Sequence, residues 1–464
     1  MTANGGPFWD KTLRLIRDIW PLGERDELRD RVQKDLPESD LDKIRRAIDA
    51  CLEGKGGEVS ARSRAAELGR AYLVLNREGR KRFLELLARE YSVDNVAVER
   101  AIEERSTIST AFELQEANHK LQNLLTAPRR KLLGQFNELP DGVKFLVDMR
   151  AELLPLVKKD SELKPFDRDM HRLLASWFDI GFLDLQRITW DTPAVILERL
   201  IKYEAVHAIS SWEDMKNRLR EDRRCYGFFH PSMPDEPLIF VEVALVNGLA
   251  DNVQELLDVN APPGDPDKAD TAIFYSISNC QKGLAGVSFG NFLIKRVVAD
   301  LSTKLPNLKT FSTLSPIPGL MSWLEKNSAE LDSREQQVLK KLQNGDGAVE
   351  YLQEMFVDDP ESKEKEGDRV ECKNVMLSLC AKYLLKTKRG SQAYDRVAHF
   401  HLSNGAMIER INWGGNLSRT GIVQSASIMV NYLYKLGQIE KNHELYTGKG
   451  EVNSSSAVRK LLKG

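Results

Sequence analysis

The stretch from residue 271 to residue 315 constrains the fold more than any other part of the chain. AIFYSIS at 272–278 and LKTFSTLS at 308–315 are rich in β-branched and aromatic residues, which is typical of strands. Between them, residues 290–303 carry apolar side chains at helical spacing. A further β-rich run, PLIFVEVALVNGL, covers residues 237–249. Strands and helices that alternate in this way predict a mixed sheet domain.

A loop of small residues joins the strand at 272–278 to the helix that follows. Its sequence, GLAGVSFGN, runs from Gly283 to Asn291. Such a loop exposes backbone N–H groups at the N-terminus of a helix, where a phosphate or pyrophosphate binds. Ser315 then brings a hydroxyl to the end of the next strand. This combination predicts a coenzyme-binding enzyme rather than a scaffold.

The first part of the chain, up to about residue 180, has the periodicity of helices throughout. Apolar side chains recur at helical spacing, and prolines at 128, 140, 155 and 165 separate the segments. We interpret the stripes as the core of a helical bundle; they comprise Phe83, Leu84 and Leu87; Leu121, Leu124 and Leu125; Leu132, Leu133 and Phe136; and Phe145, Leu146, Met149 and Leu153.

After residue 180 the composition changes, and strand-like and helical segments alternate. A helical insert is expected over about 320–386, with a solvated charged loop, EKEGDRVE, inside it. Strand-like segments return near 396–412, and a last helix is expected from Ile422 to Tyr434. The second part of the chain is therefore expected to be a mixed sheet domain.

Composition excludes several classes of function. The chain has 464 residues, of which 42% are hydrophobic, and a net charge of −2, so the overall charge gives no reason to expect a nucleic-acid partner. No apolar run reaches the ~18 residues of a membrane helix, and the N-terminus lacks the features of a secretory signal. Five scattered cysteines without CxxC spacing predict free, mostly buried thiols in a reducing cytoplasm.

The motif GVSFG, residues 286–290, has three interpretations. It fits the G-x-S-x-G nucleophile elbow of serine hydrolases, with Ser288 as the nucleophile. It is also a degenerate copy of the loop by which acetyltransferase-like folds hold acyl-CoA, in which backbone N–H groups bind the pyrophosphate. Ala285 replaces the basic or amide residue that begins that loop, and Ser288 replaces its first glycine. The third interpretation is a turn with a structural role only, and the motif alone leaves all three open.

The other candidate residues also allow two interpretations each. Ser315 is either a chemical group or the cap of a helix that starts near Pro318. His399 and His401, two positions apart on a predicted strand, share a face and form a possible metal-chelating pair, although no supporting carboxylate or cysteine lies nearby. His401 alone is also typical of a satisfied core histidine, and Tyr434 of a buried ring.

A series of longer motifs, in order and at these spacings, resembles the malonyl-CoA decarboxylase family. The motifs are EAVHAISSWEDMKNRL, RRCYGFFHPSMPDEPL, IFYSIS, GLAGVSFGNFLIKRVV, FSTLSPIPG, VAHFHLSNGA, ERINW and NYLYKL, over about residues 170–436. The resemblance implies an α+β protein, with an all-α helical bundle domain at residues 1–180 and a mixed α/β catalytic domain of acetyltransferase-like (GNAT) fold at 181–464. It also implies self-association, through the bundle, into a homotetramer.

The resemblance further implies an enzyme that makes acetyl-CoA and CO2 from malonyl-CoA without metal or biotin, so that no cofactor is expected and coenzyme A is part of the substrate. The family's catalytic serine and histidine correspond to Ser315 and His401, and its active-site tyrosine to Tyr434. Its coenzyme A loop corresponds to Ala285, Gly286, Val287, Ser288, Phe289, Gly290 and Asn291. Animal members carry an acidic residue where Ser288 stands, and the resemblance favours a pyrophosphate loop over a nucleophile elbow.

The chemistry of this reaction gives each residue an expected role. Breaking the C–C bond leaves an electron pair that the thioester carbonyl accepts as an enolate, and the C2 carbanion then needs a proton. We expect His401 to donate that proton, Ser315 to position the reacting group and relay the proton, and Tyr434 to orient the pair. The alternatives are a CoA-dependent acyltransferase, a serine hydrolase that uses Ser288, and a non-enzymatic scaffold.

Overall fold

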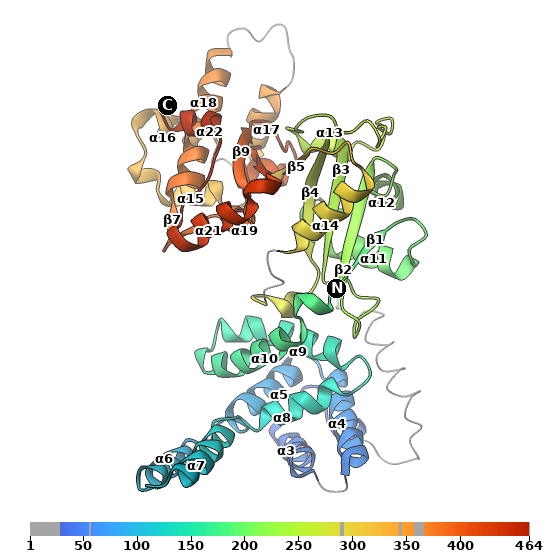
Figure 1. The fold of residues 1–464 in the computed structure, drawn as a ribbon, viewed down its shortest axis with the longest axis vertical. Helices are drawn as coiled ribbons and strands as arrows, with labels where there is room; N and C mark the ends of the chain where they lie inside the picture. Colours follow the sequence, from blue (N-terminus) through green and yellow to red (C-terminus); the bar gives the residue numbers. More distant parts are fainter. Residues whose placement is uncertain (1–27, 55–56, 288–291, 343–345, 357–365, 464) are drawn as a thin grey trace. The chain divides into compact units, whose positions relative to one another are not determined.

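The computed structural model describes residues 28–54, 57–287, 292–342, 346–356 and 366–463. The chain falls into two compact units (Figure 1). One comprises Met1–Phe182, His230–Pro234 and Gln281–Ser288, and the other comprises Leu183–Phe229, Asp235–Cys280 and Phe289–Gly464. The predicted α+β class is confirmed, because the first unit is helical and the second is built on a mixed sheet.

The helical unit is held together by an aromatic core. The rings of Tyr72 and Phe83 lie 5.0 Å apart, those of Tyr72 and Phe145 5.6 Å, and those of Phe136 and Phe145 5.2 Å, all edge to face. The helices are α2 (Leu28–Arg31), α3 (Glu38–Glu53), α4 (Gly57–Val74), α5 (Arg77–Arg89), α6 (Asn95–Ser106), α7 (Ala111–Leu124), α8 (Arg129–Asn137), α9 (Gly142–Val157) and α10 (Lys164–Trp177).

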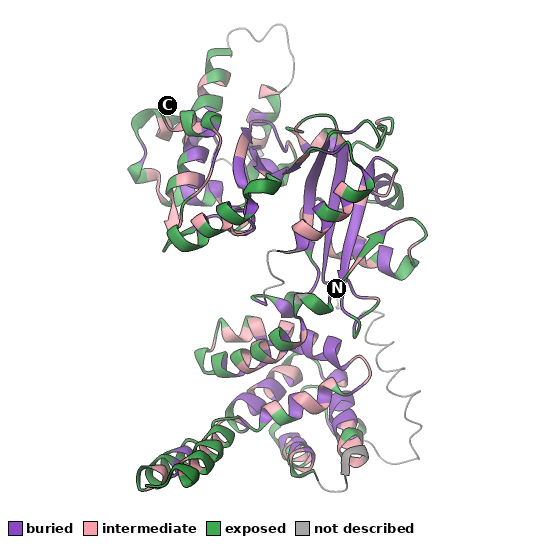
Figure 2. Ribbon diagram, in the orientation of Figure 1, coloured by how far each residue is buried: buried purple, intermediate pink, exposed green. Residues whose placement is uncertain are grey.

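One predicted core stripe is not buried. Leu121, Leu124 and Leu125 belong to or follow α7, which has no buried residue (Figure 2). Helices α6 and α7 pair with each other, and their outer faces meet solvent. Periodicity identified the helix correctly, but it could not show which helices find a packing partner.

The second unit is a mixed sheet with helices around it. The strands are β1 (Asp184–Ile188), β2 (Arg223–Phe229), β3 (Ile239–Val246), β4 (Thr271–Asn279), β5 (Thr310–Thr313), β6 (Ser315–Pro316), β9 (Met407–Asn412) and β10 (Met429–Leu433), and the short strands β7 (Lys388–Arg389) and β8 (Gln392–Ala393) form a separate pair. The order in the main sheet is β1-β2-β3-β4-β5-β10-β6, and β9 also pairs with β10. Strands β2 to β4 are buried along most of their length (Figure 2).

Strands β4 and β5 pair in parallel, and helix α14 lies between them in the sequence. Parallel neighbours need such a crossover, whereas the antiparallel pairs do not. The helices of this unit are α11 (Ala194–Tyr203), α12 (Trp212–Arg218), α13 (Val253–Leu257), α14 (Phe292–Lys304), α15 (Leu320–Lys326), α16 (Ser333–Leu342), α17 (Asp346–Met355), α18 (Glu366–Lys386), α19 (Arg396–Ser403), α20 (Arg419–Ser425), α21 (Ile439–Lys449) and α22 (Ser456–Lys460).

Three sequence predictions for this unit are wrong in part. The charged segment EKEGDRVE was expected to be a loop, but from Glu366 onward it is the first turn of α18. The strand expected over 396–412 is helix α19 followed by strand β9. The helix expected from Ile422 to Tyr434 is helix α20 followed by strand β10. The break lies at Ala426 and Ser427, whose φ angles of 48° and 67° end the helix.

The cysteines behave as predicted. All five are free and buried. Burial raises the pKa of the Cys225, Cys280 and Cys380 thiols well above the ordinary value, so they stay protonated. In the ranges that the structure describes, no helix is both long and apolar enough to cross a membrane.

Candidate active site

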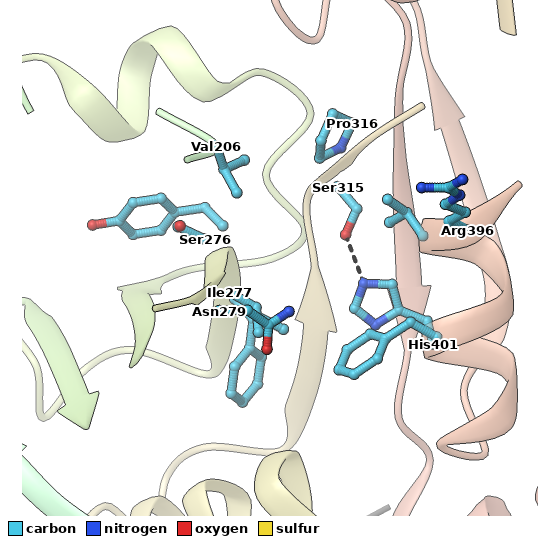
Figure 3. Close-up of a pocket in the computed structure, with 12 residues that line it drawn as sticks. Val206, Ser276, Ile277, Asn279, Ser315, Pro316, Arg396 and His401 are labelled. Atoms are coloured by element: carbon cyan, nitrogen blue, oxygen red, sulfur yellow. Dashed lines mark hydrogen bonds between the residues drawn. The ribbon is translucent and has the colours of Figure 1, made fainter. Parts of the chain in front are cut away.

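The candidate site lies where the parallel strands β4 and β5 separate. The two strands pair as far as Phe274 of β4 and Thr313 of β5. Beyond these residues β4 continues to Asn279, whereas β5 is followed by β6, which pairs with β10. A cavity of about 230 Å³ opens beside this divergence (Figure 3). It is lined by Val206, Phe274, Tyr275, Ser276, Ile277, Asn279, Ser315, Pro316, Arg396, Val397, Phe400 and His401.

His401 reaches this cavity from a helix rather than from the predicted strand. The alternation of apolar and polar residues in VAHFH resembles a strand, but Asp395 precedes it and caps a helix. The Asp395 Oδ1 atom accepts hydrogen bonds from the backbone N–H groups of Val397 and Ala398, both at 2.9 Å. This cap starts α19, and His401 lies in its last turn.

The helical conformation rules out the proposed metal-chelating pair of histidines. Residues two positions apart on a helix are turned by about 200° from each other, so they do not share a face. His399 Nδ1 lies 2.8 Å from the Tyr446 hydroxyl, whereas His401 faces the cavity with Ser315. Across the described residues, no group of three side chains is arranged to hold a metal ion.

Ser315, His401 and Tyr434 form one hydrogen-bonded chain. His401 Nε2 lies 3.1 Å from Ser315 Oγ (Figure 3), and His401 Nδ1 lies 2.9 Å from the Tyr434 hydroxyl. The three side chains come from β6, α19 and the residue that follows β10. The structure thus brings together the three residues that the resemblance selected. Ser315 does not cap a helix, because α15 begins after Gly319 without a side-chain cap.

The geometry assigns the proton positions in this chain. Burial raises the pKa of the Tyr434 phenol well above the usual value of 10.0, so its oxygen keeps a proton to donate. Within the described part of the chain this hydroxyl has no partner other than His401 Nδ1, and we assign it as the donor to Nδ1. The imidazole proton then lies on Nε2 and points to Ser315 Oγ.

Burial also keeps the imidazole neutral. The His401 side chain is 3% exposed, and loss of solvation lowers its pKa from 6.5 to about 3. Its Nε2–H is therefore the donor of a neutral ring at physiological pH. A face of the ring packs on Tyr432, with ring centroids 4.6 Å apart and an angle of 24° between the planes.

Two residues of this arrangement escaped the sequence analysis. Thr313 accepts the Ser315 hydroxyl proton at its Oγ1, at 2.8 Å, and Tyr432 stacks on His401. A signal for Thr313 existed, because residues i and i+2 of an extended segment project to the same side. A signal for Tyr432 also existed, because it lies two residues before Tyr434 and would share its face on a strand. This segment was predicted to be a helix, in which residues two apart do not share a face.

The cavity offers a mostly uncharged environment. Among the lining residues the charged side chain is Arg396, which lies in the first turn of α19 and is exposed. The other lining side chains are apolar or carry hydroxyl, amide or neutral imidazole groups. Charge that develops inside such a site is poorly screened by water, so aligned hydrogen-bond donors act strongly on it. The site is therefore suited to a reaction in which negative charge moves.

The start of the predicted coenzyme loop is held by the helical unit. Arg150 of α9, 3% exposed, donates through Nη1 to the carbonyl oxygens of Gly283 and Ala285, at 2.7 and 2.9 Å. His171 Nε2 lies 3.0 Å from the carbonyl oxygen of Gly286, whose φ is +80°. Val287 is buried. The rest of the predicted loop lies outside the described residues; it comprises Ser288, Phe289, Gly290 and Asn291.

Comparison with known proteins covers almost the whole chain. The family model for the malonyl-CoA decarboxylase C-terminal domain matches residues 181–464, and that for the N-terminal domain matches residues 91–178. The mitochondrial malonyl-CoA decarboxylase of Anser anser anser is 34% identical over 420 residues, which are 86% of this chain and 83% of the relative. The Mus musculus protein of the same name is 35% identical over 429 residues, 88% of this chain and 83% of the relative.

Solved structures agree with the sequence matches. The crystal structure of malonyl-CoA decarboxylase from Rhodopseudomonas palustris has a TM-score of 0.82 and 40% identity, over 90% of this chain and 99% of that one. The protein of the same name from Agrobacterium vitis has a TM-score of 0.79 and 39% identity, with the same coverage. The chain therefore belongs to the malonyl-CoA decarboxylase family.

Proposed function

We propose that this chain converts malonyl-CoA to acetyl-CoA and CO2, with Ser315 and His401 as its catalytic residues. The observation that carries the proposal is the hydrogen-bonded chain from Tyr434 through His401 to Ser315, which opens on a cavity between diverging strands. Membership of a family of decarboxylases supports the same reaction.

The first step breaks the bond between C2 of the malonyl group and its carboxylate carbon. The electron pair of that bond moves into the thioester, which becomes an enolate, and the carboxylate leaves as CO2. The step needs a carboxylate turned out of the thioester plane and little solvated, which the apolar walls around Ser315 favour. It also needs hydrogen-bond donors directed at the enolate oxygen.

The second step protonates C2. We assign the Ser315 hydroxyl as the group that gives the proton, while Ser315 Oγ takes the Nε2 proton of His401 and His401 Nδ1 takes the phenolic proton of Tyr434. The two transfers between protein groups run along contacts of 3.1 Å, from His401 to Ser315, and 2.9 Å, from Tyr434 to His401. One proton from solvent restores the chain, so malonyl-CoA and a proton give acetyl-CoA and CO2.

Binding of coenzyme A is assigned to the loop from Ala285 to Asn291, through backbone N–H groups at the start of α14. The described part of this loop supports the assignment, because Gly286 has a φ of +80° that residues with side chains rarely adopt. No further cofactor enters the proposed reaction, since the thioester itself accepts the electron pair.

The proposal is tested by incubating the purified chain with malonyl-CoA and measuring acetyl-CoA and CO2 by mass spectrometry. Equal amounts of both products are expected, and activity should survive EDTA and avidin. Transfer of an acyl group to an amine would indicate an acyltransferase instead. Release of malonate and free coenzyme A, abolished by Ser288→Ala, would indicate a hydrolase. Activity lost with EDTA and restored by zinc or magnesium would contradict the cofactor-free mechanism.

The proposal extends to assembly and location. We assign residues 1–180 to a helical domain that mediates assembly into a homotetramer and residues 181–464 to the catalytic domain of GNAT-like fold. Free, buried cysteines support a reducing cytoplasm as the location. Light scattering on the intact chain tests the assembly, because a monomer at micromolar concentration would contradict it, and cell fractionation tests the location.

A further inference from the structure

Thr313 is hydrogen-bonded to the proposed catalytic serine, although the proposed reaction gives Thr313 no role. Its Oγ1 atom accepts the hydroxyl proton of Ser315 at 2.8 Å and the backbone N–H of Tyr432 at 3.2 Å. The Thr313 side chain is fully buried. Its carbonyl oxygen accepts a bond from the Asn431 side chain at 2.8 Å, so the backbone of Thr313 is also tied to β10.

Ser315 Oγ can rotate about the Cα–Cβ bond of its side chain, so a second hydrogen-bond partner is needed to hold it beside His401. Ser315 Oγ lies between two groups, His401 Nε2 at 3.1 Å and Thr313 Oγ1 at 2.8 Å. With its proton directed to Thr313, Ser315 Oγ presents a lone pair to the Nε2–H of His401. Ser315 Oγ is thereby held where it can receive the imidazole proton, and its own hydroxyl proton turns from Thr313 Oγ1 to C2 of the substrate in the transfer step.

We propose that Thr313 is a positioning residue that fixes the side-chain rotamer of Ser315 beside His401. The proposal rests on the proposed decarboxylation, in which Ser315 relays the proton. Thr313 acts through Ser315, because it is not among the residues that line the cavity. Its hydrogen bond to the Tyr432 backbone also ties Thr313, at the end of β5, to β10, the strand that carries the ring stacked on His401.

Two substitutions separate the hydroxyl from the shape of the side chain. Thr313→Val replaces the hydroxyl by a methyl group of similar size, and Thr313→Ser keeps the hydroxyl and removes a methyl group. We expect Thr313→Val to lower kcat on the order of 10-fold, because small displacements of a reacting group are costly. The KM for malonyl-CoA should change less than about 3-fold, and Thr313→Ser should restore most of kcat.

Ser312 offers a matched control. It is fully buried, neighbours Thr313, and directs its hydroxyl to the carbonyl oxygens of Tyr432 at 3.2 Å and Thr313 at 3.3 Å, but not to the Thr313 side chain. Both residues therefore bond to the backbone of Tyr432, but Thr313 is the one bonded to Ser315. Ser312→Ala should lower kcat less than about 2-fold, whereas a general loosening of this strand would affect both variants alike.

A double-mutant cycle tests whether Thr313 acts through Ser315. In a Ser315→Ala background, adding Thr313→Val should change the residual kcat by less than about 2-fold. Losses that multiply, or a Ser312→Ala loss equal to that of Thr313→Val, would overturn the proposal. If wild type makes no acetyl-CoA, the proposed function has failed, and that result is separate.

A crystal structure of Thr313→Val tests the positioning without reference to turnover. We expect Ser315 Oγ to occupy a second rotamer in this variant, and one rotamer in wild type and in Ser312→Ala. A single, unchanged Ser315 rotamer in Thr313→Val would overturn the proposal whatever the activity.

Discussion

The contact between Tyr434 and His401 leads to the most specific prediction. Tyr434→Phe removes a single oxygen atom, the one that lies 2.9 Å from His401 Nδ1, and keeps the buried ring. The imidazole then loses the group that holds its proton on Nε2. Because Nε2–H is the proposed donor to Ser315, the proton relay should weaken while substrate binding persists.

The size of the effect follows from the burial of the imidazole. A hydrogen bond between uncharged groups contributes about 1 kcal/mol net, and a buried nitrogen left without a partner costs about 1–3 kcal/mol. Since about 1.4 kcal/mol corresponds to a factor of ten in rate, kcat should fall about 10- to 100-fold. His401 is 3% exposed, so water cannot easily replace the phenol.

Steady-state kinetics with malonyl-CoA would check this prediction, and Tyr446→Phe is the matched control. Tyr446 also places its hydroxyl on a histidine Nδ1 of the same helix, 2.8 Å from His399. We expect Tyr446→Phe to change kcat less than about 3-fold. An undiminished kcat in Tyr434→Phe, or equal losses in the two variants, would refute the assigned direction of the proton chain.

Three further predictions concern the same site. Ser315→Ala should lower kcat on the order of 10²-fold or more, whereas Ser288→Ala should act mainly on KM; the reverse pattern would revive a hydrolase. His401→Asn should nearly abolish decarboxylation but leave acetyl-CoA affinity, measured by calorimetry, within a few-fold, and His399→Asn should cost much less. The lowered pKa of His401 means that the unfolded chain takes up its proton near pH 6.5 and the folded one only near 3. The resulting stability is therefore present above pH 6.5 and lost as the pH falls toward 3. The free energy of unfolding, measured with urea at several pH values between 3 and 6.5, should depend less steeply on pH in His401→Asn than in wild type, by up to about 1.4 kcal/mol per pH unit. Equal pH dependence in the two proteins would contradict the burial.

Helices and buried strands were predictable where one periodicity dominates. The runs at 272–278 and 290–303 correspond to β4 and α14, since long apolar patterns leave little choice. Two of the wrong predictions, those for 396–412 and 422–434, lie where a local contact overrides the pattern. Asp395 caps a helix within an alternating sequence, and Ala426 and Ser427 end a helix within an apolar run by turning to positive φ. Neither event is visible in the spacing of apolar residues.

The sequence predicted which residues form the candidate site but not how they are arranged. Resemblance selected Ser315, His401 and Tyr434, but the residues alone gave each of them an ordinary structural interpretation. The pairing depends on strands that part after Phe274 and on a helix that approaches from the other side. Such an approach joins residues 86 positions apart and leaves no trace in local sequence.

The hydrogen bonds from Arg150 to the carbonyl oxygens of Gly283 and Ala285 have a consequence for how the protein unfolds. Residues 281–288 belong to the helical unit, although the strand before them and the helix after them belong to the other. Even a methyl group at Gly283 would fall 1.7 Å from the carbonyl oxygen of Val147, so the fit is tight. In native-state hydrogen exchange, the backbone amides of this segment should therefore open together with α9, at its free energy, and not with the neighbouring strand β4.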